Sequence, residues 1–228
     1  MKKQLKSPKQ NGSMTTINKK KMTSFRTYLE ELFPVAHFQL DYTHDYELVI
    51  VVMLSAQTTD KSVNLVTPTL FGRFPTLKAL KEAPIKDIEE AIKTIGLYRN
   101  KARHIKNIAT IIDEEFNGVV PSESELLMRL PGVGNKTRNV IQAELFNIPS
   151  FAVDTHVMRI SKRLGFAKEK NQPDQIEMIL KGLMKPQFYN KVNHQMIMFG
   201  RNICLARSPK CQICKMKNDC LYFLKNQK

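Results

Sequence analysis

Apolar residues recur every three or four positions along most of the chain, which places them on one face of a helix. The clearest cases are the segments 85–95 and 101–116, whose apolar positions are Ile85, Ile88, Ala91, Ile92 and Ile95, and Ile105, Ile108, Ala109, Ile112 and Phe116. Gly96 and the pair Asn117-Gly118 follow these segments, as is typical of helix C-termini. The same spacing predicts further helices over 24–32, 123–130, 136–146, 154–164, 175–184 and 189–201.

One apolar run, Leu48 to Leu54, has no polar interruption. Its β-branched residues suit a strand as well as a helix. No second run of this kind is present to pair with it, so we expect a buried helix. The predicted fold class is therefore all-α, without internal repeats.

Residues 1–22 are rich in lysine and contain almost no apolar residue. Such a segment cannot bury enough apolar surface to order itself, and we expect a disordered basic tail. The tail serves either as a solubilising extension, which we prefer, or as an arm that adds non-specific affinity for DNA.

The chain is strongly basic, with 36 Lys and Arg residues against 21 Asp and Glu residues and a formal net charge of +15. Residues 1–26 hold eight of the basic residues and no acidic one. A surplus of this size indicates a polyanionic partner such as DNA, RNA or an acidic membrane surface. The longest apolar run has seven residues, too few to cross a bilayer, and no apolar signal core follows the basic start. We therefore expect a cytoplasmic protein with no membrane partner.

A glycine-rich turn lies between two predicted helices, in the segment Leu130-Pro131-Gly132-Val133-Gly134-Asn135-Lys136-Thr137. Backbone N–H groups that side chains do not obstruct, placed at a helix N-terminus, form a cradle for phosphate. An ordinary connection between helices is the alternative, but on a basic protein the pattern favours nucleic acid. The segment resembles a helix–hairpin–helix motif, and we expect DNA contacts from Gly132, Val133, Gly134, Thr137 and Arg138.

Two residues near this turn suggest chemistry. Lys136 lies in the first helical turn, where the positive end of the helix dipole disfavours a charged amine and favours a nucleophilic one. The alternative is a lysine that only pairs with a phosphate. Asp154 either caps the next predicted helix or stabilises positive charge that develops at a sugar C1′. The residue pattern leaves both alternatives open.

All four cysteines lie within Cys204-x6-Cys211-x2-Cys214-x5-Cys220. This close spacing indicates a metal centre. Structural zinc sites more often use two Cys-x2-Cys pairs, whereas iron–sulfur clusters tolerate unequal spacing. We therefore favour an iron–sulfur cluster over zinc. Arg207 and Lys210 lie in the loop after Cys204 and are either DNA phosphate contacts or solvated side chains.

Taken together, these segments resemble the endonuclease III family of helix–hairpin–helix DNA glycosylases, over about residues 25–222. The resemblance rests on Leu54-Ser55-Ala56-Gln57-Thr58-Thr59-Asp60, on Gly96-Leu97-Tyr98 before Lys101-Ala102, on Leu130–Thr137, on Val153–Val157 and on the cysteine spacing. It implies two helical lobes on either side of a DNA-binding groove. A six-helix domain would span 38–148, with the helix–hairpin–helix at about 122–146, and 23–37 with 149–228 would form the cluster domain.

The resemblance also implies an activity and its residues. A bifunctional DNA glycosylase/AP lyase of base excision repair would act as a monomer on double-stranded DNA that contains oxidised pyrimidines or abasic sites. Lys136 would form a Schiff base, Asp154 would assist base loss, and β-elimination would cleave the strand 3′ to the abasic sugar. The four cysteines would hold a [4Fe-4S] cluster, and Gln57 and Leu97 would fill the gap left by the flipped nucleotide.

Three positions depart from the family's common pattern. Asn135 stands where a basic residue is frequent, Arg138 where a small residue is usual, and Phe199 where a His precedes Gly200-Arg201. The alternatives are a mismatch-directed thymine or adenine glycosylase of the same superfamily, or a non-catalytic iron–sulfur protein that binds DNA. Lys136 argues against the adenine enzyme, which lacks this lysine.

Overall fold

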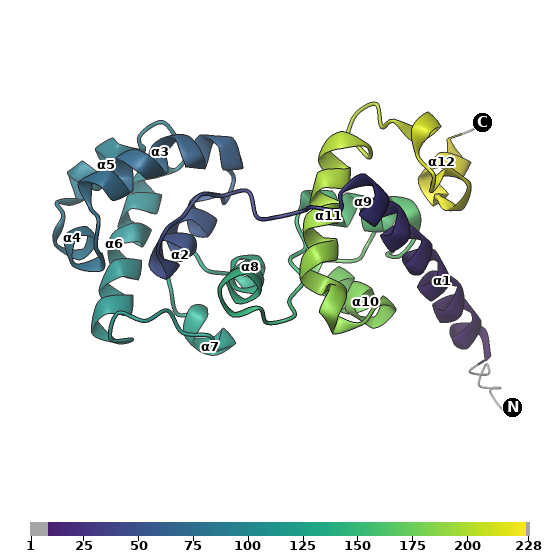
Figure 1. The fold of residues 1–228 in the computed structure, drawn as a ribbon, viewed down its shortest axis with the longest axis horizontal. Coiled ribbons are helices and arrows are strands. Elements are labelled where there is room, and N and C mark those ends of the chain that lie inside the picture. The colour runs from purple at the N-terminus through teal and green to yellow at the C-terminus, as the bar shows by residue number, and fades with distance from the viewer. Residues whose placement is uncertain (1–8, 227–228) are drawn as a thin grey trace, which may run out of the picture. The chain divides into compact units, whose positions relative to one another are not determined.

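A computed structural model describes the backbone of residues 9–226 and the side chains from residue 16 onward. The regular secondary structure of this part of the chain is helical, and it contains no strand (Figure 1). The prediction of an all-α fold is confirmed. The α-helices are α1 (Lys9–Leu32), α2 (Asp45–Leu54), α3 (Asp60–Arg73), α4 (Leu77–Glu82), α5 (Ile85–Ile92), α6 (Tyr98–Glu114), α7 (Ser124–Leu127), α8 (Asn135–Phe146), α9 (Thr155–Leu164), α10 (Pro173–Leu183), α11 (Tyr189–Asn202) and α12 (Leu221–Lys225), and three short 3-10 helices are η1 (Pro186–Phe188), η2 (Cys211–Ile213) and η3 (Lys217–Asp219).

The chain divides into two compact units. One unit is Phe38–Ser150, and the other joins the chain up to His37 with the chain from Phe151 onward. Each unit has its own hydrophobic core.

The core of the unit Phe38–Ser150 is built around α2. Every residue from Glu47 to Leu54 is buried, because a helix that is apolar on all sides must be enclosed by its neighbours. Helices α3, α6 and α8 pack against it. The uninterrupted apolar run is therefore the buried helix that the sequence predicted. The long amphipathic helix α6 adds Ile105, Ile108 and Ile112 to this core.

The core of the second unit is aromatic. Helix α9 packs against α10, α11 and α12, and α1 packs against α10 and α11. Phe199 of α11 is 1% exposed, and its ring meets the rings of Phe25 and Tyr28 edge-on, at centroid distances of 5.3 and 6.0 Å. These geometries are favourable for aromatic pairs. The Phe199 departure from the family pattern thus places an apolar ring in the core of this unit.

The prediction of a disordered tail over residues 1–22 is wrong from residue 9 onward, where α1 begins. The end of that stretch is held by contacts distant in sequence: Met22 is fully buried, and Lys21 Nζ donates a hydrogen bond of 2.9 Å to the carbonyl oxygen of Leu164. A lysine at this carbonyl also suits the negative C-terminal end of α9. Residues 1–8 lie outside the described part of the chain.

Candidate functional site

The predicted hairpin connects α7 to α8 through residues 128–134. Gly132 has a φ of +82°, and a Cβ there would lie 2.8 Å from Met53 Cγ and 2.9 Å from His104 Nδ1. Glycine is therefore required both by the backbone and by the space. Gly134 has open space around its Cα. The turn thus packs against the unit on one side and leaves Gly134 accessible on the other.

Helix α8 begins at this turn without a side-chain cap. Gly134 is the N-cap residue and contributes no capping side chain. The first N–H groups of a helix have no acceptor within the helix, and together with the helix dipole they attract an anion. The Val133 N–H is already used within the turn, where it donates to the Leu130 carbonyl oxygen at 3.1 Å. We therefore assign the anion-binding groups to the start of α8 rather than to Val133, whose side chain is buried.

Lys136 is the second residue of α8 and is exposed. Among the described residues, its amine has neither an ion-pair partner nor a hydrogen-bond acceptor. Because it lies beside the uncapped N-terminus, an anion held there would lie next to this amine. Thr137, which follows, is half-buried.

Arg138 is occupied inside the hairpin. Its guanidinium donates to the side-chain oxygens of Asn139 at 2.9 Å and Asn135 at 3.3 Å, and approaches Met128 Sδ at 3.7 Å. Its Nε is buried and finds no acceptor in the described part of the chain. The structure thus uses Arg138 to tie the first turn of α8 to the turn before it, and its contact with phosphate stays a prediction.

Asp154 is the N-cap residue of α9, and its Oδ1 accepts a hydrogen bond of 2.8 Å from the Val157 N–H. Its other carboxylate oxygen meets no donor within residues 9–226. Capping, one of the two interpretations of this residue, is therefore observed, and it leaves half of the carboxylate available. Lys136 belongs to the unit Phe38–Ser150 and Asp154 to the other unit.

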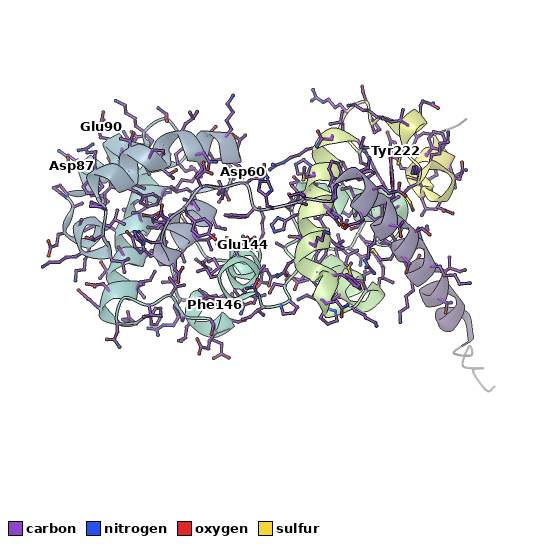
Figure 2. The ribbon with its side chains drawn as sticks, in the orientation of Figure 1. Asp60, Asp87, Glu90, Glu144, Phe146 and Tyr222 are labelled. Carbon is purple, nitrogen blue, oxygen red and sulfur yellow. The ribbon has the colours of Figure 1, made fainter. Side chains whose placement is uncertain are left out.

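Gln57 and Leu97 share an unusual backbone conformation. Gln57 has a φ of 55° and Leu97 a φ of 61°, in the left-handed region that costs a residue with a Cβ roughly 1–2 kcal/mol. Both side chains are exposed, and Leu97 is 57% exposed. Strain of this kind gathers at functional sites. Gln57 lies in the turn between α2 and α3, just before Asp60, which is labelled in Figure 2.

The four cysteines line one small pocket, whose other walls are largely apolar. None of them is in a disulfide. No three His, Cys, Asp or Glu side chains of the described chain converge closely enough to hold a single metal ion, as a zinc site with bonds of about 2.3 Å to sulfur requires.

Burial governs the chemistry of these thiols. It raises the pKa of the Cys214 thiol to about 11. It also raises the pKa of the Cys211 thiol, and the neighbouring Cys220 and Cys204 raise that pKa further. Four thiolates would therefore gather here only around a cationic centre that compensates their charge. The donor set thus fits a cysteine-ligated iron–sulfur cluster, whose presence membership of the family described below implies.

Two arginines of α9, which the sequence analysis did not single out, hold the loop that carries Cys204. Arg159 donates to the carbonyl oxygens of Cys204 at 3.0 Å and Gly200 at 2.9 Å. Arg163 donates to Cys204 Sγ at 3.4 Å and to the Leu205 and Ala206 carbonyl oxygens at 2.6 and 3.0 Å. Their spacing of four residues on one helix face was the available signal.

The same arginine helps to hold the C-terminal segment. The Arg163 guanidinium lies 4.3 Å from the ring centroid of Tyr222, which is labelled in Figure 2. The backbone carbonyl oxygen of Arg163 accepts a hydrogen bond of 3.3 Å from Cys220 Sγ. Arg207 and Lys210 are exposed and form no ion pair within the described residues, so both remain available to an anionic partner.

Comparison with known proteins decides the family. Residues 50–186 match the family described as HhH-GPD superfamily base excision DNA repair protein. Endonuclease III of Bacillus subtilis is 39% identical over 204 residues, which are 90% of this chain and 93% of the relative. Endonuclease III of Escherichia coli K12 is 39% identical over 206 residues, which are 90% of this chain and 97% of the relative. The chain belongs to the endonuclease III family.

Solved structures agree with this assignment. A trapped covalent intermediate of endonuclease III with DNA matches with a TM-score of 0.88 at 39% identity, over 92% of this chain and 99% of that chain. A non-covalent complex of endonuclease III with DNA matches with a TM-score of 0.88 at 40% identity, over 91% and 97%. A thermostable thymine-DNA glycosylase has a TM-score of 0.81 at 23% identity and shows a shared fold only.

Membership of the endonuclease III family makes the chain a DNA glycosylase/AP lyase of base excision repair, and DNA is its partner. The predicted family and enzyme class are confirmed. In the described part of the chain, no helix combines the length and the apolarity that crossing a membrane requires.

We expect the two hairpin glycines to respond differently to alanine. Gly132→Ala should destabilise the protein by about 1–3 kcal/mol, because the Cβ is strained at positive φ and meets Met53 and His104. Gly134→Ala should stay within about 0.5 kcal/mol of the parent but weaken binding to DNA, because its methyl group lies at the helix N-terminus. Urea unfolding and fluorescence anisotropy with a duplex measure the two effects. Equal stability of both variants would contradict the geometry of the turn.

Proposed function

We propose that this enzyme removes oxidised pyrimidines from double-stranded DNA and cleaves the strand 3′ to the resulting abasic sugar, through a Schiff base on Lys136. The observation that carries this proposal is the exposed amine of Lys136 in the first turn of α8, beside a helix N-terminus that has no side-chain cap. The covalent endonuclease III–DNA intermediate of similar fold supports it.

The first step takes place at the sugar C1′. The uncapped N–H groups of α8 hold a phosphate of the flipped nucleotide, which places C1′ next to the Lys136 amine. The nitrogen lone pair forms a bond to C1′, and the bond from C1′ to the base breaks, with its electron pair leaving on the base. The nitrogen then loses a proton, its lone pair forms the C=N bond, and the C1′–O4′ bond breaks with its electron pair on O4′, which takes up a proton; the product is the protonated Schiff base.

Asp154 stabilises the positive charge that develops on the sugar while the base departs. One of its oxygens is fixed by the Val157 N–H, so the carboxylate is held by its own helix while the second oxygen faces no other donor in the described structure. The carboxylate is therefore already oriented when the charge appears, which is the condition for electrostatic catalysis.

Strand cleavage follows from the Schiff base. Loss of a proton from C2′ supplies the electron pair of a new C2′–C3′ double bond, and the bond from C3′ to the phosphate oxygen breaks, with the phosphate as leaving group. Water then hydrolyses the imine and restores the Lys136 amine. The lysine is thus regenerated without an oxidant or a reductant.

The remaining candidate residues act on the DNA. Gln57 and Leu97 fill the gap that the flipped nucleotide leaves, in agreement with their exposure and strained turns. Gly132, Gly134 and Thr137 form the backbone surface beside the phosphate, and Arg207 and Lys210 add charge from the cysteine loop. The enzyme works as a monomer, on DNA of the bacterial cytoplasm.

The cofactor is a [4Fe-4S] cluster ligated by Cys204, Cys211, Cys214 and Cys220. When bound, it supplies a cationic core that cross-links the loops from Cys204 to Cys220. Arg159 and Arg163 hold the first of these loops against α9, so the cluster region and the helix that begins after Asp154 form one structure.

Cys214→Ser should lower iron content, folding yield and affinity for DNA together, because Cys214 is one of the four ligands in the shared pocket. The parent protein should contain about four iron atoms and four acid-labile sulfides per chain. Iron and sulfide assays, with circular dichroism for the fold, make the measurement. A variant that lacks iron but keeps its fold and full activity would contradict the structural role of the cluster.

Lys136→Ala should abolish the covalent adduct that borohydride traps between the enzyme and a duplex containing one thymine glycol, and also that on an abasic duplex, while DNA affinity stays within about threefold. Lys78→Ala, at an exposed lysine of α4, is the control and should trap like the parent. An adduct with Lys136→Ala would remove this lysine from the mechanism.

The parent protein in the same assay separates the alternative functions. An adduct on the abasic duplex alone would keep the lyase but assign a different base to the glycosylase. No adduct on either duplex, with binding intact, would favour a monofunctional mismatch glycosylase or a non-catalytic DNA-binding protein.

Asp154→Asn should slow base release by about 10²–10³-fold and leave stability nearly unchanged, because asparagine caps a helix as well as aspartate does. Asp154→Ala removes the cap as well, and should cost about 1 kcal/mol in addition. Single-turnover release of thymine glycol and thermal unfolding measure the two effects. If the Asp154→Asn variant released thymine glycol at the parent rate, the role of Asp154 would be limited to capping α9.

A further inference from the structure

Lys101 of α6 is a buried lysine that the mechanism does not use. It is 4% exposed, and its Nζ donates a hydrogen bond of 2.6 Å to Thr58 Oγ1. The described residues supply it with no carboxylate. Burial lowers the pKa of Lys101, as expected for an amine taken out of water without a counter-ion. An apolar residue would pack here at less cost, so the amine has a purpose that packing does not explain.

The position of Lys101 connects the two strained turns. Its backbone N–H donates to the Leu97 carbonyl oxygen at 3.0 Å, and its side chain reaches Thr58, the residue directly after Gln57. Five described residues other than glycine have positive φ. Three of them are the short polar residues Asn117, Asn147 and Ser208, and the other two are Leu97 and Gln57, both exposed. The bond to Leu97 is a backbone bond that any residue at this position would make, whereas the bond to Thr58 depends on the lysine amine; both lie within the single unit Phe38–Ser150.

The hydrogen bond from Lys101 continues across Gln57. The Thr58 hydroxyl accepts from Lys101 and donates to the Ala56 carbonyl oxygen at 3.4 Å, while the Thr58 N–H donates to the Ser55 carbonyl oxygen at 3.1 Å. The residues on both sides of Gln57 are thus joined by one chain of hydrogen bonds that starts at the amine. Such chains strengthen each other where water is excluded.

We propose that Lys101 is a positioning residue that holds Gln57 in the left-handed turn from which it enters the DNA, while Leu97 keeps its own turn through the backbone. The inference rests on the proposed gap-filling role of these two residues. Without the bond from Lys101, the turn at Gln57 relaxes toward the right-handed backbone that a residue with a Cβ prefers. Its side chain then reaches the gap in only a fraction of the molecules, and extrusion of the damaged nucleotide slows.

Two variants remove this bond from opposite ends. Lys101→Met keeps the unbranched stem and fills the buried site, and Thr58→Val keeps the shape of threonine. Each should slow thymine glycol release from a duplex by roughly tenfold, and the double variant should be no slower than the worse single one, because both remove one interaction. Thr110→Val is the control, since Thr110 lies on the same helix and bonds only to the Lys106 carbonyl oxygen.

A readout that bypasses extrusion distinguishes positioning from a general effect on the enzyme. Borohydride trapping on a single-stranded abasic oligonucleotide requires Lys136 chemistry but no gap filling. The rate of trapping should stay within about twofold of the parent for both variants. The fluorescence of 2-aminopurine placed opposite the lesion should show slower extrusion on the duplex.

The outcomes separate this inference from the function on which it rests. Equal rates of duplex repair in the parent and both variants would overturn the role of Lys101, and so would an equal loss on single-stranded and duplex substrates. If Gln57→Ala and Leu97→Ala also repair the duplex at the parent rate, the gap-filling proposal itself fails. If duplex repair is slower in those two variants but not in Lys101→Met, only the inference about Lys101 fails.

Discussion

The N–H groups that begin every α-helix have no acceptor within that helix, and each helix must find one elsewhere. The two helices that carry the candidate catalytic residues meet this constraint in opposite ways. Helix α9 is capped by Asp154, whose Oδ1 accepts from Val157. The N-cap residue of helix α8 is Gly134, which has no side chain to offer. An open helix start can bind an external anion in place of water, and DNA supplies one in its phosphates. The affinity for the backbone and the placement of Lys136 thus have the same physical origin.

Helix α9 joins the chemistry of this site to the cysteine centre. Asp154 precedes its first turn, and Arg159 and Arg163, about one and two turns after the start of the helix, hold the segment from Gly200 to Ala206 by their guanidinium groups. Both arginines are half-buried, and each bonds to carbonyl oxygens of this segment. Loss of the cysteine centre would release these carbonyl groups and, with them, the packing of α9. In the proposed mechanism the cluster would therefore serve the reaction without taking part in it, by stabilising the helix that holds the Asp154 carboxylate.

The sequence predicted what depends on local pattern. The period of apolar residues located the helices, and the buried run 48–54 became a helix because no strand partner exists. The hairpin was recognised from Gly132 and Gly134, of which Gly132 alone has the positive φ that favours glycine. Local pattern did not predict the features that depend on tertiary contacts. Lys21 and Met22 belong to a stretch whose composition resembles disorder, yet Leu164, far along the chain, gives Lys21 its hydrogen-bond partner. Lys101, Arg159 and Arg163 are three among 36 basic residues, and only tertiary packing shows which of them are enclosed.

The backbone at Gln57 and Leu97 shows why strain is retained in this fold. Glycine at either position would relieve the left-handed conformation at no steric cost, and glycine or asparagine is the usual solution at such turns. A glycine, however, has no side chain with which to fill a gap in a DNA duplex. A strained glutamine and a strained, exposed leucine are therefore informative together: the side chain must be worth more to the enzyme than the stability that its conformation costs. This argument applies to both turns, and at Gln57 the hydrogen bond from Lys101 to the next residue, Thr58, supports the strained backbone.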